Sequence, residues 1–295
     1  MRMFLLLVAS VAISVPALAQ QMPAEYAAVL AATGRLGDYK EGVLKVNVPR
    51  NDLSVVVDGV ATPTPFGFGG WFALTKGDQG MDVLMGDLVL TEDEVNPVMS
   101  AVLDNGLDVS ALHNHFFFDT PRMFYMHVHG HGTAAELSRK MSPALALIGK
   151  APARGAATAP AGRAIEGTLD TEALARIVGT AGEQTGAVYK ITIGRADVTM
   201  REMGAVINAR MGLNTWAAFY GTDADAVVAG DVAMLAAEVT PVLKALRASG
   251  LDVVAIHHHM VGIEPTVTFL HYWGTGPAQM LATGVRAAVN VIGRR

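Results

Sequence analysis

Hydrophobic and polar positions follow two different periods along this chain. Residues 92–104 carry apolar side chains at helical spacing (Val95, Val98, Met99 and Val102), and Asn105-Gly106 follows as a stop signal. This pattern predicts a helix over 92–104. Short apolar runs rich in β-branched residues occur elsewhere and predict strands, because such runs are typical of half-buried or buried extended segments.

The predicted elements occur twice in the same order. Each copy starts with a helix, over 24–32 and 172–178, and continues with strands over 43–48 and 188–193, strands beginning at Trp71 and Trp216, and strands over 82–90 and 226–234. The helix over 92–104 and its counterpart come next. Two strands and a further helix follow, and in the first copy that helix begins at about Thr133. Residues 200–211 have methionines at helical spacing, but they align with the strand-like segment 54–57. We therefore expect them to be extended.

The order recurs because the sequence itself is repeated. Residues 94–97 (EVNP) return as 238–241 (EVTP), and Gly86-Asp87 returns as Gly230-Asp231. Lys45 and Trp71 also have counterparts at nearly the same offset, in Lys190 and Trp216. Self-similarity at a fixed period indicates a repeated structural unit. We expect an α+β fold made of two tandem copies of a mixed strand/helix module, related by pseudo-twofold symmetry and packed through their core faces.

The repeat also sets the expected domain boundaries. Residues 20–149 form the first module and residues 169–295 the second. Residues 150–168 between them are rich in Ala, Gly and Pro without apolar periodicity, which favours a linker.

Residues 1–19 have the features of a signal peptide. Arg2 precedes an uncharged apolar stretch, and Ala17-Leu18-Ala19 is typical of a signal-peptidase site. The alternative, a membrane anchor, is less favoured because the apolar stretch is short. We expect a periplasmic or secreted protein with no membrane span after cleavage.

Composition narrows the chemistry. The 295 residues are 51% hydrophobic and 17% charged, with a net charge of −5 and no cysteine. No basic run is present to neutralise phosphates, so nucleic acid is not an expected partner. Disulfides, thiolate metal sites and cysteine nucleophiles are excluded.

All nine histidines fall in the two-strand segment of each copy. His113, His115 and His127 in the first copy have counterparts in His257, His259 and His271, with a proline between the second and third histidine each time. Alternate residues of a strand share a face. A chain reversal at Thr120 would place His113 opposite His127, and one at Glu264 would place His257 opposite His271.

Each copy is therefore predicted to bring three imidazoles together on a hairpin. Three neutral imidazoles with an open position are the ligands of catalytic zinc, and they also suit copper. The alternative is that they are solvent-facing or hydrogen-bonded histidines. His258 is expected to point to the other face. His129 and His131 form either a second site or, as we favour, ordinary surface positions.

The blocks around these histidines resemble a known family. The segments 111–115 (ALHNH), 255–260 (AIHHHM), 269–274 (FLHYWG) and 212–219 (GLNTWAAF) are similar to those of the LppY/LpqO family of exported bacterial proteins, over nearly all of the mature chain. The resemblance implies no activity, since that family's function is unassigned. Its named members are lipoproteins, but this chain lacks the cysteine that a lipid anchor needs. Copy one departs from the pattern after His115, which makes copy two the better candidate if a single site is active.

Three functions are compatible with these features. The first is an exported metal-binding protein with duplicated three-histidine sites for a divalent transition metal, zinc or copper. The second is a metal-dependent hydrolase acting on an envelope or extracellular substrate, with Glu264 as the catalytic base beside the metal. The third is a non-metal module that binds a small-molecule or envelope-derived ligand between the two halves.

Overall fold

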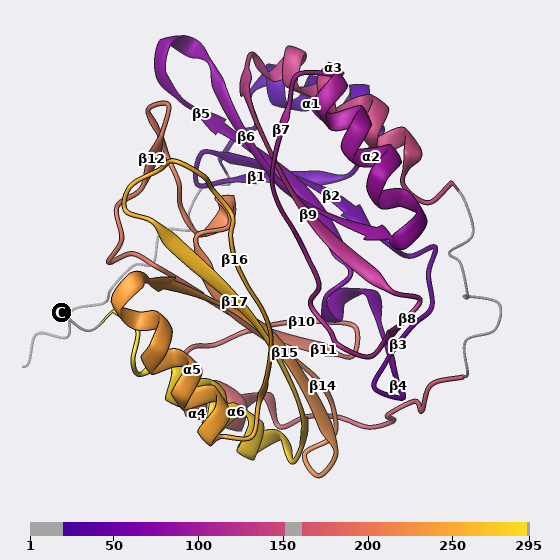
Figure 1. The fold of residues 1–295 in the computed structure, drawn as a ribbon, viewed down its shortest axis with the longest axis vertical. Helices are drawn as coiled ribbons and strands as arrows, with labels where there is room; N and C mark the ends of the chain where they lie inside the picture. The colour runs from indigo at the N-terminus through magenta and orange to yellow at the C-terminus, as the bar shows by residue number, and fades with distance from the viewer. Residues whose placement is uncertain (1–19, 151–160, 294–295) are drawn as a thin grey trace, which may run out of the picture.

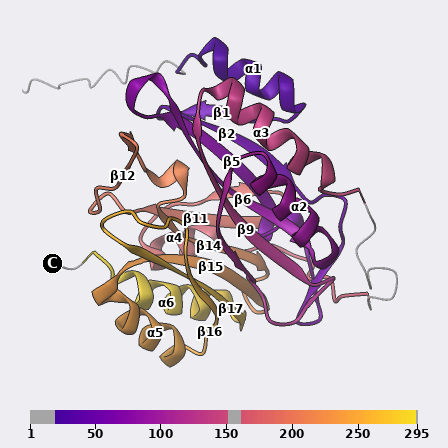
Figure 2. The same ribbon diagram turned by 45° about the horizontal axis from the view of Figure 1, so that its top comes forward.

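The computed structural model describes residues 20–150 and 161–293. The predicted signal peptide and residues 151–160 of the predicted linker lie outside the described residues. Two six-stranded antiparallel sheets face each other, and three helices cover the outer side of each sheet (Figures 1 and 2). The layers therefore run helices, sheet, sheet, helices.

The first half supplies the first sheet and its helices. Its elements are α1 (Ala24–Thr33), β1 (Gly37–Lys40), β2 (Val43–Pro49), β3 (Val55–Val57), β4 (Val60–Thr62), β5 (Gly69–Lys76), β6 (Asp82–Thr91), α2 (Glu92–Asp104), β7 (Asp108–His113), β8 (Asp119–Thr120), β9 (Met123–Gly132) and α3 (Ala134–Leu147).

The second half repeats this series. Its elements are α4 (Thr171–Val178), β10 (Glu183–Thr185), β11 (Val188–Gly194), β12 (Arg201–Glu202), β13 (Ala205–Val206), β14 (Asn214–Gly221), β15 (Ala226–Leu235), α5 (Val239–Ala248), β16 (Asp252–His258), β17 (Val267–Gly276) and α6 (Ala278–Val289).

The two sheets have corresponding strand orders. The first is β1-β2-β5-β6-β9-β7 and the second is β10-β11-β14-β15-β17-β16. The predicted mixed fold of two domain-like repeats is confirmed, and every helix and main strand predicted from the repeat is present within a few residues.

Strand alternation divides each sheet into two faces. In β2, Leu44, Val46 and Val48 pack against the helices of the first half, so Lys45 and Asn47 point toward the second half. The second half has an equivalent helix-covered core, which includes Tyr189 and Ile191.

Between the sheets lie two further apolar clusters, each built from both halves. One includes Phe66, Phe116 and Trp273, and the other includes Met85, Met211 and Phe269. The expected packing of the two copies through their inner faces is thus present. The candidate site lies on these inner faces.

Residues 200–211 are extended only in part. They form the short β12–β13 hairpin, and residues 209–211 make a 3₁₀ turn. The hairpin gives this segment strand character, as the repeat predicted, while the turn does not follow that prediction.

The predicted strand register is wrong by two residues in both copies. His127 pairs with Ala111 and His113 with Tyr125, while His271 pairs with Ala255. The chain reversal is centred one residue earlier than predicted, at Asp119 in the first copy and at Ile263 in the second, and this sets the partner of each histidine. The irregularity between Val109 and Ala111, and its equivalent in β16, shifts the pairing by one residue only on the side away from the hairpin loop. Alternation in the sequence does not fix the point of reversal, because a shift of two residues in the pairing keeps the same side chains on the same face.

In the part of the chain that the structure describes, no helix has the length and apolar character needed to cross a bilayer.

Candidate metal centre and adjoining cavity

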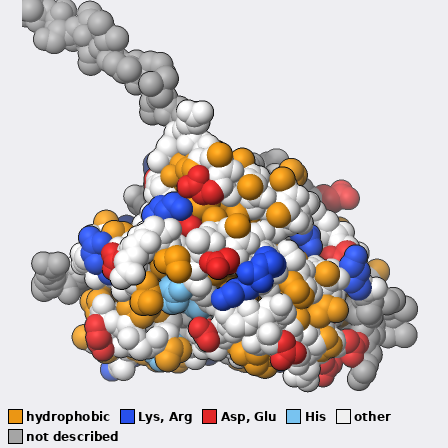
Figure 3. Space-filling view, turned by 90° about the horizontal axis from the view of Figure 1, so that it is seen from above, with side chains coloured by type: hydrophobic (Ala, Val, Ile, Leu, Met, Phe, Trp, Pro, Cys, Tyr) orange, Lys and Arg blue, Asp and Glu red, His pale blue; other side chains and the backbone are white. Residues whose placement is uncertain are grey.

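Six histidines meet where the two halves touch. The edge strands β7 and β16 lie beside each other, so the rings of His113 and His257 stack with their centroids 3.7 Å apart. Figure 3 shows histidine reaching the molecular surface in a small area of the face seen there. The centre is therefore shared between the copies.

This arrangement corrects the predicted grouping of ligands. Among the described residues, two sets of three histidines bring ligand nitrogens within 4.8 Å of one another. The sets are His113, His127 and His257, and His113, His115 and His271. Each set draws on both copies, so a complete site within one hairpin is not what the fold builds. Because the edge strands β7 and β16 are in contact, the rings of His113 and His257, from different copies, are 3.7 Å apart, whereas those of His113 and His127, from one copy, are 5.0 Å apart.

Two close contacts link the copies. The Nε2 atoms of His113 and His271 are 3.2 Å apart, and those of His127 and His257 are 3.3 Å apart. The Nδ1 of His271 lies 3.3 Å from the carbonyl oxygen of Gly230. Because a carbonyl only accepts, this Nδ1 carries the hydrogen and Nε2 presents a lone pair to His113.

Aromatic rings support the outer histidines. His115 stacks on Tyr125 at 3.3 Å between centroids, and His259 stacks on Phe269 at 3.4 Å. The Nδ1 atoms of His113 and His257 and both ring nitrogens of His115 are buried with no hydrogen-bond partner among the described residues. Buried nitrogens without partners are costly, and His115, with neither ring nitrogen bonded, is free to offer a lone pair to an ion.

Burial keeps these imidazoles neutral. Desolvation, reinforced by the neighbouring histidines, holds the pKa of His113, His115, His127, His259 and His271 well below the usual range. Desolvation also lowers the pKa of His257, to about 3. A neutral imidazole is the form that binds a metal.

The remaining histidines have varied positions. His258, which was expected to point to the other face, is exposed and belongs to neither histidine set. His129 is buried rather than on the surface: its Nε2–H donates to the His259 carbonyl at 2.7 Å, and Nδ1 lies 3.6 Å from Glu202. His131 is half-buried, 3.3 Å from the same carboxylate. The expectation of two surface residues is therefore wrong for His129.

Glu264 lies on the surface, in the loop between β16 and β17. Its carboxylate accepts a hydrogen bond from the Thr266 amide at 3.3 Å, and it belongs to neither histidine set. Its role as a general base stays a prediction.

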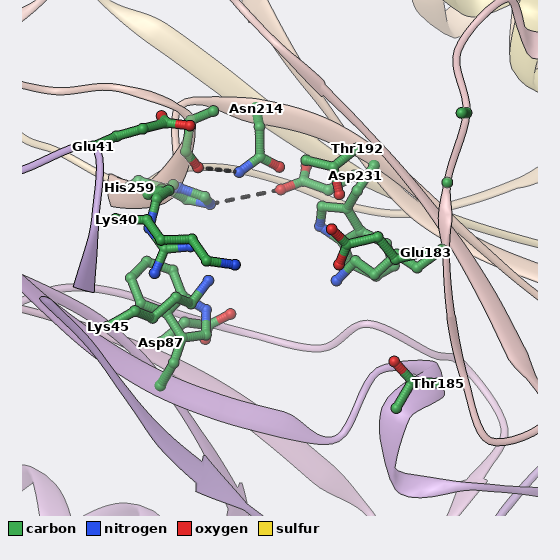
Figure 4. Close-up of a pocket in the computed structure, with 18 of the residues that line it drawn as sticks. Lys40, Glu41, Lys45, Asp87, Glu183, Thr185, Thr192, Asn214, Asp231 and His259 are labelled. Carbon is green, nitrogen blue, oxygen red and sulfur yellow. Dashed lines mark hydrogen bonds and ion pairs between the residues drawn. The ribbon is translucent and has the colours of Figure 1, made fainter. Parts of the chain in front are cut away.

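A cavity of about 590 Å³ adjoins the histidine centre and includes His259 and His271 in its wall (Figure 4). Each sheet places a row of side chains on its inner face, across hydrogen-bonded strands. The rows are Trp71–Asp87–His127 in the first sheet and Trp216–Asp231–His271 in the second. Lys45 and Lys190 lie diagonally beside these rows on the neighbouring strands, with Nζ 4.2 Å and 4.1 Å from the centroids of Trp71 and Trp216.

Burial shifts the titration of these groups toward their neutral forms. It lowers the pKa of Lys45 to about 7, with Lys190 and Arg210 adding repulsion, and the pKa of Lys190 to about 8. It raises the pKa of Asp87 to about 7, and that of Asp231 well above the usual range.

The sequence predicts, as one alternative, a ligand bound between the two halves, but it does not identify the residues that line this cavity. The signal was present, since Lys45, Trp71 and Asp87 all return in the second copy. On the sequence alone, these matches indicate duplication and nothing more.

Comparisons with known proteins give a family but no activity. A family model described as Domain of Unknown Function (DUF1259) matches residues 27–147 and again residues 172–291. No curated protein matches the chain.

Three solved structures are similar at low identity. They are the trimeric bacterial microcompartment shell protein PduB (11% identity, 88% of this chain and 91% of that chain, TM-score 0.22), EtuB from Clostridium kluyveri (9%, 88% and 92%, TM-score 0.21) and the double ringed trimeric shell protein MSM0271 from the RMM microcompartment (11%, 84% and 95%, TM-score 0.18).

The expected periplasmic or secreted location is corrected by this finding. Two of the three similar structures are described as microcompartment shell proteins, and none of the three as an exported protein. At TM-scores of 0.22 and below, the likeness assigns no other location in its place.

Proposed function

We propose a metal-binding function for this chain, which belongs to the family described as Domain of Unknown Function (DUF1259). The metal is one divalent transition ion, zinc or copper, bound by histidines of both halves. The family's description names no activity, so the proposal is drawn from the histidine centre alone.

The observation that carries the proposal is the spacing of the histidine nitrogens. Ligands 2.0–2.1 Å from a tetrahedral zinc ion are about 3.3–3.4 Å from each other. The Nε2 pairs His113–His271 and His127–His257 are 3.2 Å and 3.3 Å apart. Each pair is therefore spaced as two ligands of one ion would be.

The surroundings of His271 favour the same interpretation. Metal-binding histidines commonly donate their other ring N–H to a carbonyl or carboxylate, which fixes the tautomer. His271 does this through Nδ1 to Gly230. A hydrogen bond between the two imidazoles of each pair is the alternative, and metal analysis separates the two.

His113 belongs to both histidine sets. One neutral imidazole has one lone pair, so it binds one ion at a time. We therefore propose one ion per chain, with His127 and His257 as co-ligands in one position and His115 and His271 in the other.

We also propose that the two halves are related by pseudo-twofold symmetry, which is compatible with the matching rows Trp71–Asp87–His127 and Trp216–Asp231–His271. The resemblance to the LppY/LpqO family remains part of the proposal.

The first prediction is about one equivalent of zinc or copper per chain in protein purified without an affinity tag, measured by elemental analysis. His113→Ala removes the ion, because both positions lose a ligand. His127→Ala and His115→Ala distinguish the two positions, since each residue belongs to one set. The exposed His258 gives the matched control, and His258→Ala leaves the metal content unchanged.

A protein that stays metal-free after incubation with zinc and copper, or a His113→Ala variant with full metal content, overturns the proposal. Circular dichroism of each variant shows that the fold is retained.

A further inference from the structure

The cavity beside the histidine centre holds two lysines with unusual surroundings. Lys45 and Lys190 come from equivalent strands, β2 and β11, and both line the cavity. Each ammonium group lies over an indole ring. Neither forms a hydrogen bond or ion pair with any other described residue. Two partly desolvated cations therefore face one space without counter-ions in contact.

The acidic groups of the cavity do not fill that role. The Leu270 amide donates to Asp231 at 3.1 Å, and the Asp231 carboxylate lies 3.7 Å from Nε2 of His259 (Figure 4). Asp87 has one buried oxygen without a partner among the described residues. The side chains of Glu41 and Glu183 are exposed.

The other basic groups are farther out or already paired. Lys40 is exposed, and Arg210 donates to Asp38 at 2.7 Å. Among the residues that the structure describes, Lys45 and Lys190 are thus the cations with free donors in the inner part of the cavity. Each lysine ammonium has three N–H donors and no acceptor, so its natural partner is an oxygen that bears negative charge.

We propose that this cavity binds a small anion through a carboxylate or phosphate group, held between Lys45 and Lys190 and flanked by Trp71 and Trp216. The volume of about 590 Å³ is that of a small-molecule site. The indole faces provide apolar surface for the rest of the ligand. The wall formed by His259 and His271 brings the ligand beside the proposed metal.

This inference deepens the proposed function by naming the ligand class of the adjoining cavity, but its binding step is tested without metal. Metal-free protein is titrated with inorganic phosphate, with benzoate, and with neutral benzamide as the uncharged analogue of benzoate. Trp71 and Trp216 supply a tryptophan fluorescence signal, and calorimetry gives the affinity. Phosphate and benzoate compared with each other show which kind of anion the site prefers.

We expect at least one anion to bind and benzamide not to bind. Lys45→Met and Lys190→Met keep the apolar stem and remove the charge, and each weakens anion binding by about tenfold or more, the effect expected for one charge-assisted hydrogen bond. Lys244 is exposed on α5, and Lys244→Met is the matched control with unchanged affinity.

Binding that is equally strong in Lys45→Met, Lys190→Met and Lys244→Met overturns the anion site, as does the absence of binding by both anions. Metal content of the lysine variants is measured separately and stays at the wild-type level. The two measurements are therefore independent. The anion site can be confirmed or rejected even if no metal binds, and the metal site can be confirmed or rejected even if no anion binds.

Discussion

Arg50 is almost fully buried, and its guanidinium is held on several sides. It donates to both oxygens of Glu94, at 2.6 Å and 3.1 Å, to Asp52, and to the Val89 carbonyl. Glu94 also accepts from the Gly149 amide at 2.6 Å. One carboxylate thus fixes the start of α2, the loop after β2 and the end of the first half.

Removing the charge of Glu94 is predicted to destabilise the protein by about 3 kcal/mol, because it leaves the buried guanidinium with one carboxylate partner, Asp52, instead of two. Glutamine has nearly the same shape as glutamate, so the loss of unfolding free energy in Glu94→Gln reports the contribution of charge and hydrogen bonding. Glu92 is exposed in the same helical turn, and Glu92→Gln is expected to change the free energy of unfolding by less than about 0.5 kcal/mol. Urea unfolding measures both; equal losses in the two variants contradict the prediction.

At the scale of single elements, Gly230 in β15 shows how the sheet makes room for its neighbours. A Cβ atom at this position would lie 2.2 Å from the Tyr272 hydroxyl and 2.3 Å from the Trp216 carbonyl oxygen. That hydroxyl donates to the same carbonyl at 3.3 Å. The glycine therefore lets Tyr272 cross the strand directly beside Asp231.

Gly230→Ala is predicted to cost about 1–3 kcal/mol, because the tyrosine ring or the strand must move. Gly69 in β5 has open space around its Cβ position, and Gly69→Ala is expected to be nearly neutral. Thermal unfolding of the two variants checks this prediction. A Gly230→Ala protein that melts with the wild type would show that the strand relaxes at little cost.

For the whole molecule, burying six neutral histidines between the halves makes stability depend on pH. Their pKa values lie below those of unfolded histidine. Below about pH 6.5 the unfolded chain therefore binds more protons, and stability falls as the pH falls, by up to about 1.4 kcal/mol per unit for each histidine. Asp87 and Asp231, whose pKa values are raised, oppose this trend, but six groups outweigh two.

We predict that metal-free protein loses stability steadily between pH 7 and pH 5.5, as measured by urea unfolding. His127→Gln removes one buried imidazole and reduces that loss by about 1 kcal/mol. His258→Gln, at an exposed position, does not change it. A pH-independent free energy of unfolding in metal-free protein contradicts this account.

Much of this architecture could be predicted from the sequence, because the two copies report the same elements. The helix over 92–104 and the strand pairs followed from periodicity and repetition. The partner of each histidine did not, since it depends on where the chain reverses between β7 and β9 and on contact between β7 and β16. The residues that line the cavity were missed for a related reason. Lys45, Trp71 and Asp87 are far apart in the sequence, and only the strand order places them on one face.

The shared position of the histidines has a consequence for how such a centre can arise. One copy alone carries three of the six histidines and one row of the cavity. A chain with a single copy could complete the centre only by forming a dimer, so the fraction of complete sites would depend on protein concentration. Joining the copies in one polypeptide makes that encounter intramolecular. In the duplicated chain the site is therefore complete at any dilution, and the copies are free to diverge, as Tyr125 and Phe269 have, without losing each other.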